Sequence, residues 1–435
     1  MKRRDVLLGA TAIGLGAVSR PARAADKVIR LMTTEVDPKT QDAIGSIIAE
    51  YEKTHPGVKI QAEYAGWNDI YKKLLADLAA GDPPHIVTVH DFNIFELQRQ
   101  GVLRPMEDVV TAIGTNSYNP RALEPYRREG HIWGVPLSLN MNMLWYRSDL
   151  YAQAGLKPPE TWADYEHNCE VLFKAGESGG KRNYYGTVLA AGTSGLSEDT
   201  IHTWMWTNGA QLTDAAGKSL ADSPEAVETF AYLKRLARYA PPATTSYTHQ
   251  EMLNSYATGA TAHTEYGYRV LNVVERQNPE LLKTSVPIVY PKGPGPHGRH
   301  AIQVYVKGWA ILKDAKDTDV AADFIQFMET GDREMRLLHS VPLHYWPPRL
   351  AVAADPKFRD DPIMNSPAGQ KSLAVVNEGI SSGVFALEET GTPVLKVGTI
   401  LQDGDLSAAL QRVLLKGQSP QDSLRQLSMQ INATK

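Results

Sequence analysis

The chain has 435 residues, of which 43% are hydrophobic and 22% are charged, and its formal net charge is −4. Such a composition indicates a globular protein with room for two or three domains, and the acidic balance disfavours nucleic-acid binding, which needs a basic face. The single cysteine, Cys169, excludes an intramolecular disulfide, so packing must supply the stability.

The first residues predict an export signal. Lys2-Arg3-Arg4 precedes an apolar stretch over 6–18, and Ala22-Arg23-Ala24 is a small-x-small cleavage site. The stretch is too short for a membrane-spanning helix, so we expect residues 1–24 to be a removed signal peptide. The arginine pair favours twin-arginine export, with the general secretory route as the alternative. Without a cysteine directly after the cleavage site, we expect a periplasmic protein that is not lipid-anchored.

Strands and helices alternate after the signal. Strand patterns at 28–33, 58–64 and 86–89 are separated by two amphipathic helices. The first helix opens at Asp37-Pro38 with proline at its first position, and the second ends at Gly81-Asp82-Pro83-Pro84. This spacing favours parallel strands joined by crossover helices, which is an α/β lobe.

The pattern changes near residue 132. Apolar runs at 132–136 and 141–146 suit buried strands that pass between lobes. Thr161 with Asp164 three residues later predicts a capped helix start. Further expected elements are a helix after Ser223-Pro224, a surface loop at 291–300, a strand at 301–312, a helix around 321–328 and a mostly helical region at 355–435.

The sequence contains no strong enzymatic or metal-binding motif. We therefore expect no metal and no cofactor. Two pairs of nearby histidines lack a supporting ligand cluster and favour surface or loop positions, and two adjacent glutamates favour a solvated pair. These residues are His85 and His90, His297 and His300, and Glu388-Glu389.

Aromatic residues gather at strand ends and in loops. Trp67 follows the second strand, Trp204 and Trp206 follow a Gly/Ser-rich loop, and further aromatics lie at 266–268 and 345–346. Open α/β sheets bind ligands at the carboxyl ends of their strands. An aromatic ring beside polar side chains suits a sugar there. Each ring alone could be a core residue, but the set favours a pocket.

Five segments together resemble one protein family. They are Gly81-Asp82-Pro83-Pro84-His85-Ile86-Val87, Gly101-Val102-Leu103-Arg104-Pro105-Met106, Gly130-His131-Ile132-Trp133-Gly134-Val135-Pro136, Leu144-Trp145-Tyr146-Arg147-Ser148-Asp149-Leu150, and 155–162 with its Thr161-Trp162. In this order and spacing they are similar to the extracellular solute-binding proteins of bacterial ABC importers, in the maltose-binding-protein-like, carbohydrate branch.

The resemblance implies a type II periplasmic binding protein fold, with two α/β lobes joined by a hinge of crossing strands. The expected first lobe is 25–140 plus about 305–345, and the second is about 141–304 plus 346–435. A ligand would bind in the cleft, and the lobes would close over it. The implied partners are a carbohydrate-like ligand and the permease subunits of the inner membrane, and the protein is expected to be a monomer.

The resemblance and the strand-end positions nominate a set of ligand contacts. They are Glu35, Trp67, Asp91, Asn140, Asp199, His202, Trp206, Glu265, Tyr268, Arg269, Tyr305, Lys307 and Trp346. Arg269 stands where relatives carry a stacking tryptophan, so an acidic or modified sugar gains weight, while a neutral sugar or polyol stays open.

Two other functions remain open at this point. One is an exported carbohydrate-active enzyme that uses Asp91 and Glu265 as paired carboxylates across the cleft. The other is a ligand sensor for a membrane receptor.

Overall fold

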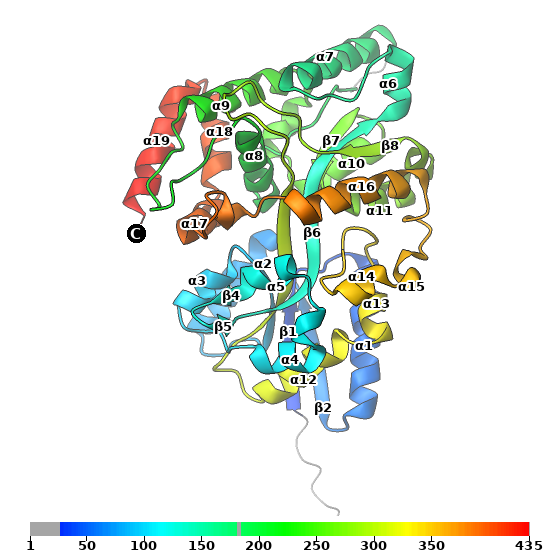
Figure 1. Cartoon of the computed structure of the whole chain (residues 1–435), viewed down its shortest axis with the longest axis vertical. Coiled ribbons are helices and arrows are strands. Elements are labelled where there is room, and N and C mark those ends of the chain that lie inside the picture. Colours follow the sequence, from blue (N-terminus) through cyan, green and yellow to red (C-terminus); the bar gives the residue numbers. More distant parts are fainter. Residues whose placement is uncertain (1–26, 181–183, 435) are drawn as a thin grey trace, which may run out of the picture.

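The computed structural model describes residues 27–180 and 184–434. The expected signal peptide lies outside this range. The described chain forms two α/β lobes, one above the other in Figure 1, with two long strands passing between them. No helix in the described part of the chain is both long and apolar enough to span a membrane.

The first lobe is built on three parallel strands. β1 (Lys27–Thr33) pairs with β2 (Val58–Tyr64) on one side and with β3 (Ile86–His90) on the other. All five residues of β3, including the polar Thr88 and His90, are buried, as expected of a central strand. The three strands therefore end at one edge of the sheet, where Glu35, Trp67 and Asp91 follow them.

Local sequence signals set the helix starts in this lobe. α1 (Pro38–Thr54) begins after Asp37, whose side chain accepts a hydrogen bond from the Lys39 backbone amide. The other helices of the lobe are α2 (Trp67–Ala79), α3 (Ile94–Arg99), α4 (Glu107–Ile113), α5 (Pro120–Leu123), α12 (Thr318–Met328), α13 (Asp332–Leu338), α14 (Leu350–Ala354) and α15 (Pro356–Arg359), and a small hairpin comprises β4 (Arg127–Arg128) and β5 (His131–Ile132).

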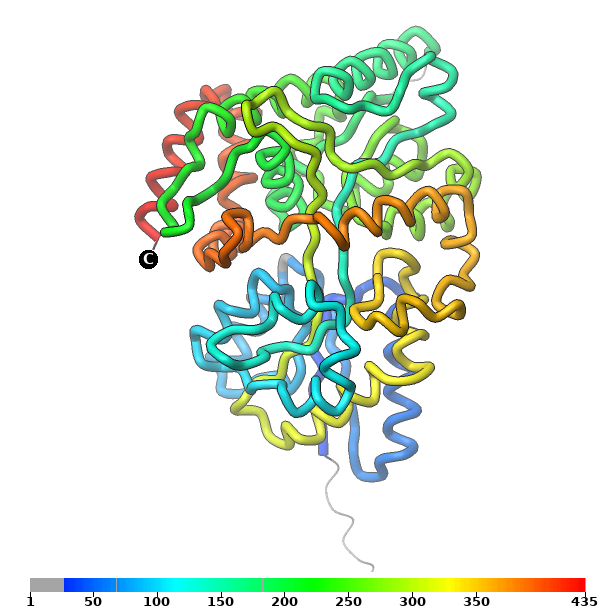
Figure 2. The backbone as a smooth tube through the Cα atoms, in the orientation of Figure 1, coloured from blue at the N-terminus to red at the C-terminus, as the bar shows by residue number. Residues whose placement is uncertain are grey.

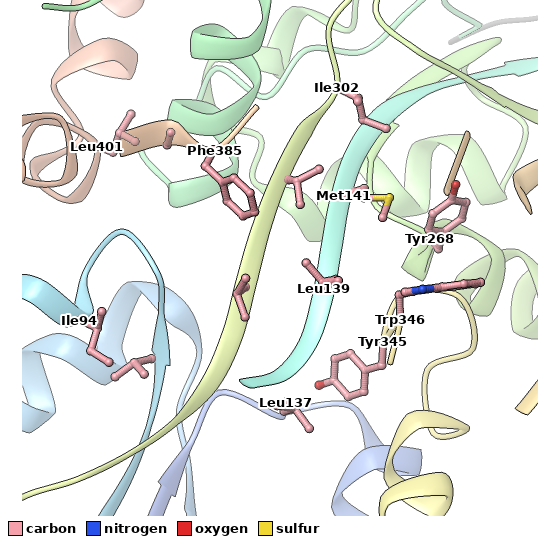
Figure 3. Packing of buried hydrophobic residues seen from close by; sticks show 14 of the residues in the cluster. Ile94, Leu137, Leu139, Met141, Tyr268, Ile302, Tyr345, Trp346, Phe385 and Leu401 are labelled. Carbon is pink, nitrogen blue, oxygen red and sulfur yellow. The ribbon is translucent and has the colours of Figure 1, made fainter. Parts of the chain in front are cut away.

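Two antiparallel strands connect the lobes. β6 (Val135–Arg147) pairs with β9 (Gln303–Ile311) through its first half and with β7 (His263–Tyr266) and β8 (Ser285–Ile288) through its second half. β9 pairs in turn with β3. One sheet thus runs through both lobes in the order β2-β1-β3-β9-β6-β7, with β8 also on β6. Figure 3 shows Leu137, Leu139 and Met141 following one another along β6.

The two runs expected at 132–136 and 141–146 are therefore parts of one strand from 135 onward. Ser138 and Asn140, which lie between these runs, and Asn142, which lies in the second run, are all buried. Within the hinge, Ser138 donates a hydrogen bond to Asn140, and the Asn142 side-chain amide donates one to Gln303. In the sequence, polar residues interrupt the apolar pattern here. In the structure, the same residues lie where β6 pairs with β9 and passes from one lobe to the other.

The second lobe is mainly helical. α7 (Trp162–Ser178) starts with the capping box expected at Thr161 and Asp164. The ring of Trp162, the first residue of α7, stacks on the ring of Tyr232 in α9, with 4.1 Å between their centroids. The remaining helices are α6 (Ser148–Ala154), α8 (Gly195–Thr207), α9 (Pro224–Leu236), α10 (His249–Ala257), α11 (Arg269–Gln277), α16 (Pro367–Ser382), α17 (Leu395–Asp403), α18 (Asp405–Leu415) and α19 (Pro420–Ala433).

The last crossing between the lobes lies later in the chain than residue 345. Residues 346–359 contact the first lobe: Trp346 pairs with Leu139, Arg349 pairs with Tyr118, and Phe358 stacks on His339. Figure 2 shows the chain rising to the second lobe only after this segment, towards α16. The boundary is hard to place from sequence because α14 and α15 are short and continue the helical pattern of their neighbours.

Candidate ligand site between the lobes

A buried charge cluster lies where the first lobe, the hinge and the second lobe meet. Glu35 follows β1, Lys307 lies on β9, and Arg269 opens α11 of the second lobe. The Lys307 ammonium donates to Glu35 and, at 3.1 Å, to the Tyr345 hydroxyl, while Arg269 Nη2 lies 3.5 Å from Glu35 Oε2. Burial alone would raise the pKa of Glu35, but Lys307 and Arg269 outweigh it and lower that pKa.

Aromatic rings line the first-lobe side of this cluster. The His90 ring lies against Trp67 with 3.7 Å between centroids and 5.0 Å from the Tyr305 ring. His90 is 7% exposed, so it is not the surface residue that the sequence favoured. Neither of its ring nitrogens has a hydrogen-bond partner among the described residues. Burial, with Lys307 nearby, holds the pKa of His90 well below its usual value, so the ring is neutral at pH 7.

The second lobe and the segment before Trp346 complete the surroundings. The rings of Tyr266 and His344 are stacked at 5.9 Å, and His344 Nδ1 is another buried atom without a partner in the described part of the chain. Asp199 accepts a hydrogen bond from Gln303 at 2.7 Å. Burial raises the pKa of Asp199 to about 7 against that bond. Because Gln303 lies on β9, this hydrogen bond places the Asp199 carboxyl beside the hinge.

Ion pairs between the lobes extend outward from Glu35. Asp37 lies 3.6 Å from Arg269 and 3.2 Å from Arg276, and Lys39 lies 3.1 Å from Glu275. Glu35 is buried, Asp37 is partly buried and Lys39 is half exposed. We call these contacts between α1 and α11 the ion-pair ladder. They hold the lobes together on this side, which is the arrangement of a closed cleft.

The structure thus brings together six of the nominated residues: Glu35, Trp67, Asp199, Arg269, Tyr305 and Lys307. Two more lie behind them. The Asn140 amide donates to the His344 carbonyl at 2.8 Å and so fixes the segment that carries His344 and Tyr345. Trp346 packs edge-on against Phe358, with its backbone paired to Leu139. Figure 3 shows Tyr345 and Trp346 on neighbouring positions with their side chains apart.

Four nominated side chains are engaged inside the second lobe. His202 and Trp206 both contact the Glu389 carboxylate, at 2.8 and 2.9 Å. Glu389 is buried and also accepts hydrogen bonds from two backbone amides. The expectation of a solvated Glu388-Glu389 pair is therefore wrong for Glu389. A carboxylate that accepts hydrogen bonds from four donors can be buried. Tyr268 donates to the Ser372 carbonyl and meets Trp145 edge-on.

Glu265 is the fourth of these. It accepts hydrogen bonds from Trp204 at 3.2 Å and Tyr290 at 3.3 Å, and burial raises its pKa to about 8. Asp91 lies elsewhere, in a small hollow between the lobes with Phe385 and Glu388, where it accepts a bond from the Val306 amide. Each carboxyl thus has its own set of contacts, Glu265 inside the second lobe and Asp91 beside Phe385.

Four residues near the charge cluster were not nominated from sequence: His90, Tyr266, His344 and Tyr345. Each is one or two positions from a nominated neighbour, Asp91, Tyr268 or Trp346. Successive residues of an extended chain point to opposite faces, so a motif match that is off by one selects the wrong face. The buried run of β3 ending in His90 was the available signal. In the described ranges, no group of three or more His, Cys, Asp or Glu is placed to hold a metal.

Comparisons with known proteins identify the family of this chain. Residues 37–331 match the family model described as bacterial extracellular solute-binding protein, and the chain belongs to this family. It is 24% identical over 343 residues to YcjN of Escherichia coli (strain K12), a periplasmic-binding protein assigned to an ABC transporter, covering 78% of this chain and 77% of that protein. It is also 24% identical to the mannitol-binding protein of Pseudomonas aeruginosa, over about half of each chain.

Solved structures share the fold. Maltose-bound MalE3 of T. maritima superposes with a TM-score of 0.80 at 17% identity, covering 94% of this chain and all of that one. A solute-binding protein of Agrobacterium radiobacter K84 in complex with ribitol gives a TM-score of 0.80 at 19% identity, covering 94% and 99%. The two-lobed fold expected from the sequence is confirmed.

Proposed function

We propose that this protein captures a sugar or polyol in the cleft between its lobes and delivers it to the permease of an ABC importer. The observation that carries the proposal is the gathering of aromatic rings and unpartnered polar atoms around Tyr305, where both lobes and the hinge meet. Rings pack against the C–H faces of a sugar, and unpartnered donors and acceptors bind its hydroxyls. Relatives named for mannitol, ribitol and maltose support this class of ligand.

The closed arrangement is the form offered to the permease. β6 and β9 are the elements that bend when the lobes separate, and the ion-pair ladder forms only when α1 and α11 meet. A ligand held by both lobes stabilises this form by its difference in affinity between closed and open states. The protein then acts in the periplasm as a monomeric, non-catalytic receptor.

Binding is tested by thermal unfolding and titration calorimetry with a panel of sugars, alditols, sugar acids and glycerol phosphates. A ligand at 100 times its Kd adds about 2.7 kcal/mol to the free energy of unfolding, a rise of several degrees in Tm. Trp67→Ala removes the ring against His90 and should abolish this rise. Trp133→Ala, on the β4–β5 hairpin, is the matched control and should keep it. A panel without heat or Tm shift, or turnover of a bound sugar, would refute the proposal.

A further inference from the structure

His90 is a polar residue in a buried position, where it destabilises the folded protein. Its side chain is buried between Trp67, Tyr305 and Phe92, and both ring nitrogens lack a protein partner in the described ranges. A buried polar group without a hydrogen bond is destabilising. The backbone amide of His90 is satisfied by Asn93 at 2.9 Å, so the strand end itself does not need the imidazole. A phenylalanine would fill the same space at lower cost.

The charged groups around His90 are already matched to one another. Lys307 is bound to Glu35, and Arg269 lies between Glu35 and Asp37. An acidic ligand would have to compete with these carboxylates for the two cations, and Asp199, which accepts a hydrogen bond from Gln303 on β9, is a further acidic residue at the hinge. Among the described residues, the buried side-chain atoms without a hydrogen-bond partner include the ring nitrogens of His90 and Nδ1 of His344, which belong to neutral groups.

We infer that His90 is a ligand-contacting residue and that the ligand is an uncharged polyhydroxylated molecule, a neutral sugar or alditol. The inference rests on the proposed function and narrows it. A neutral imidazole presents one donor and one acceptor, which matches a hydroxyl pair, and Trp67 and Tyr305 pack on the ligand's C–H faces. His344, whose Nδ1 also lacks a partner among the described residues, supplies a further neutral contact. An acidic sugar, which Arg269 alone would favour, is therefore a less suitable ligand.

His90→Phe separates ligand binding from folding. The variant keeps the ring against Trp67 and removes both nitrogens, so its Tm without ligand should equal or exceed that of the wild type. Its Kd for the neutral ligand should rise about 10- to 100-fold, because hydroxyl groups of the bound ligand lose their partners. A residue with only a structural role would give the opposite pair of results, a lower Tm and an unchanged Kd.

Two further variants complete the test. His90→Gln returns an amide near the lost nitrogens and should recover part of the affinity. His131→Phe is the matched control, since its imidazole is on the first-lobe surface and bonded to Glu107, and its Kd should not change.

The calorimetric panel separates the possible failures. If the wild type binds neutral sugars or alditols and His90→Phe binds them equally well, the assignment of His90 is refuted. If only sugar acids or phosphates bind, the neutral ligand class is refuted while a solute-binding function stands. If no compound binds, the proposed function fails and this inference fails with it.

Discussion

Replacing Glu35 by glutamine tests how the charge cluster contributes to stability. Glu35→Gln keeps the shape of the side chain but leaves the Lys307 ammonium buried without its carboxylate. The attraction between Glu35 and Arg269 at 3.5 Å is about 5 kcal/mol at an effective dielectric constant of 20, before desolvation is subtracted. Removing one partner of a buried pair costs about 3–5 kcal/mol. We expect a loss near 3 kcal/mol, because Arg269 retains Asp37.

The double variant Glu35→Gln/Lys307→Met identifies the cause. Removing both charges eliminates the uncompensated ammonium, so we expect most of the loss to be recovered, with a coupling energy of about 2 kcal/mol or more. Glu50→Gln is the control, since Glu50 pairs with Arg333 at the surface and should cost less than about 1 kcal/mol. Urea unfolding followed by circular dichroism at pH 7 measures five proteins: the wild type, Glu35→Gln, Lys307→Met, the double variant and Glu50→Gln.

The pH dependence gives an independent check. The pKa of Glu35 is lowered in the folded protein, so its contribution is present above the unfolded pKa of about 4.3 and disappears as pH falls through the folded value. The gap between the wild type and Glu35→Gln should therefore close in acid. A loss below 1 kcal/mol at pH 7, or a double variant as unstable as the sum of the single ones, would refute the reasoning.

Two other predictions concern groups away from this cluster. Burial raises the pKa of Glu265 to about 8, so the contribution of Glu265 to stability is complete below its unfolded pKa and is lost as pH rises to 8. In urea unfolding, Glu265→Gln should therefore gain stability relative to the wild type between pH 5 and pH 8. A difference in unfolding free energy that stays constant over this range would contradict the prediction. In the ion-pair ladder, Lys39→Glu should weaken ligand binding about 2- to 5-fold at low salt and less at 0.5 M salt. The swap Lys39→Glu/Glu275→Lys should restore the Kd measured by calorimetry, and a swap as weak as the single variant would count against a ladder that favours closure.

The fold was largely predictable because its signals are local. The strand at 58–64 has the predicted bounds, and the Thr161 capping box formed as expected. The candidate site was only partly predictable. Glu35, Trp67 and Lys307 meet through tertiary structure that strand-end reasoning anticipates in general terms. Choosing His90 rather than Asp91 as the ligand contact depends on which face of β3 points into the cleft. The role of Glu389 depends on donors about 180 residues earlier, which no local pattern records.

The bonds of Glu389 also bear on the order in which the chain folds. The backbone amides of Leu212 and Thr213, and the ring of Trp206, are satisfied by a carboxylate near the end of the chain. During synthesis these groups emerge long before their partner does. The first lobe, whose strands and helices all precede Pro367, can assemble while the ribosome is still working. The second lobe cannot fold completely until its last helices have been synthesised. A nascent chain therefore passes through a stage in which the first lobe is folded and the second is not.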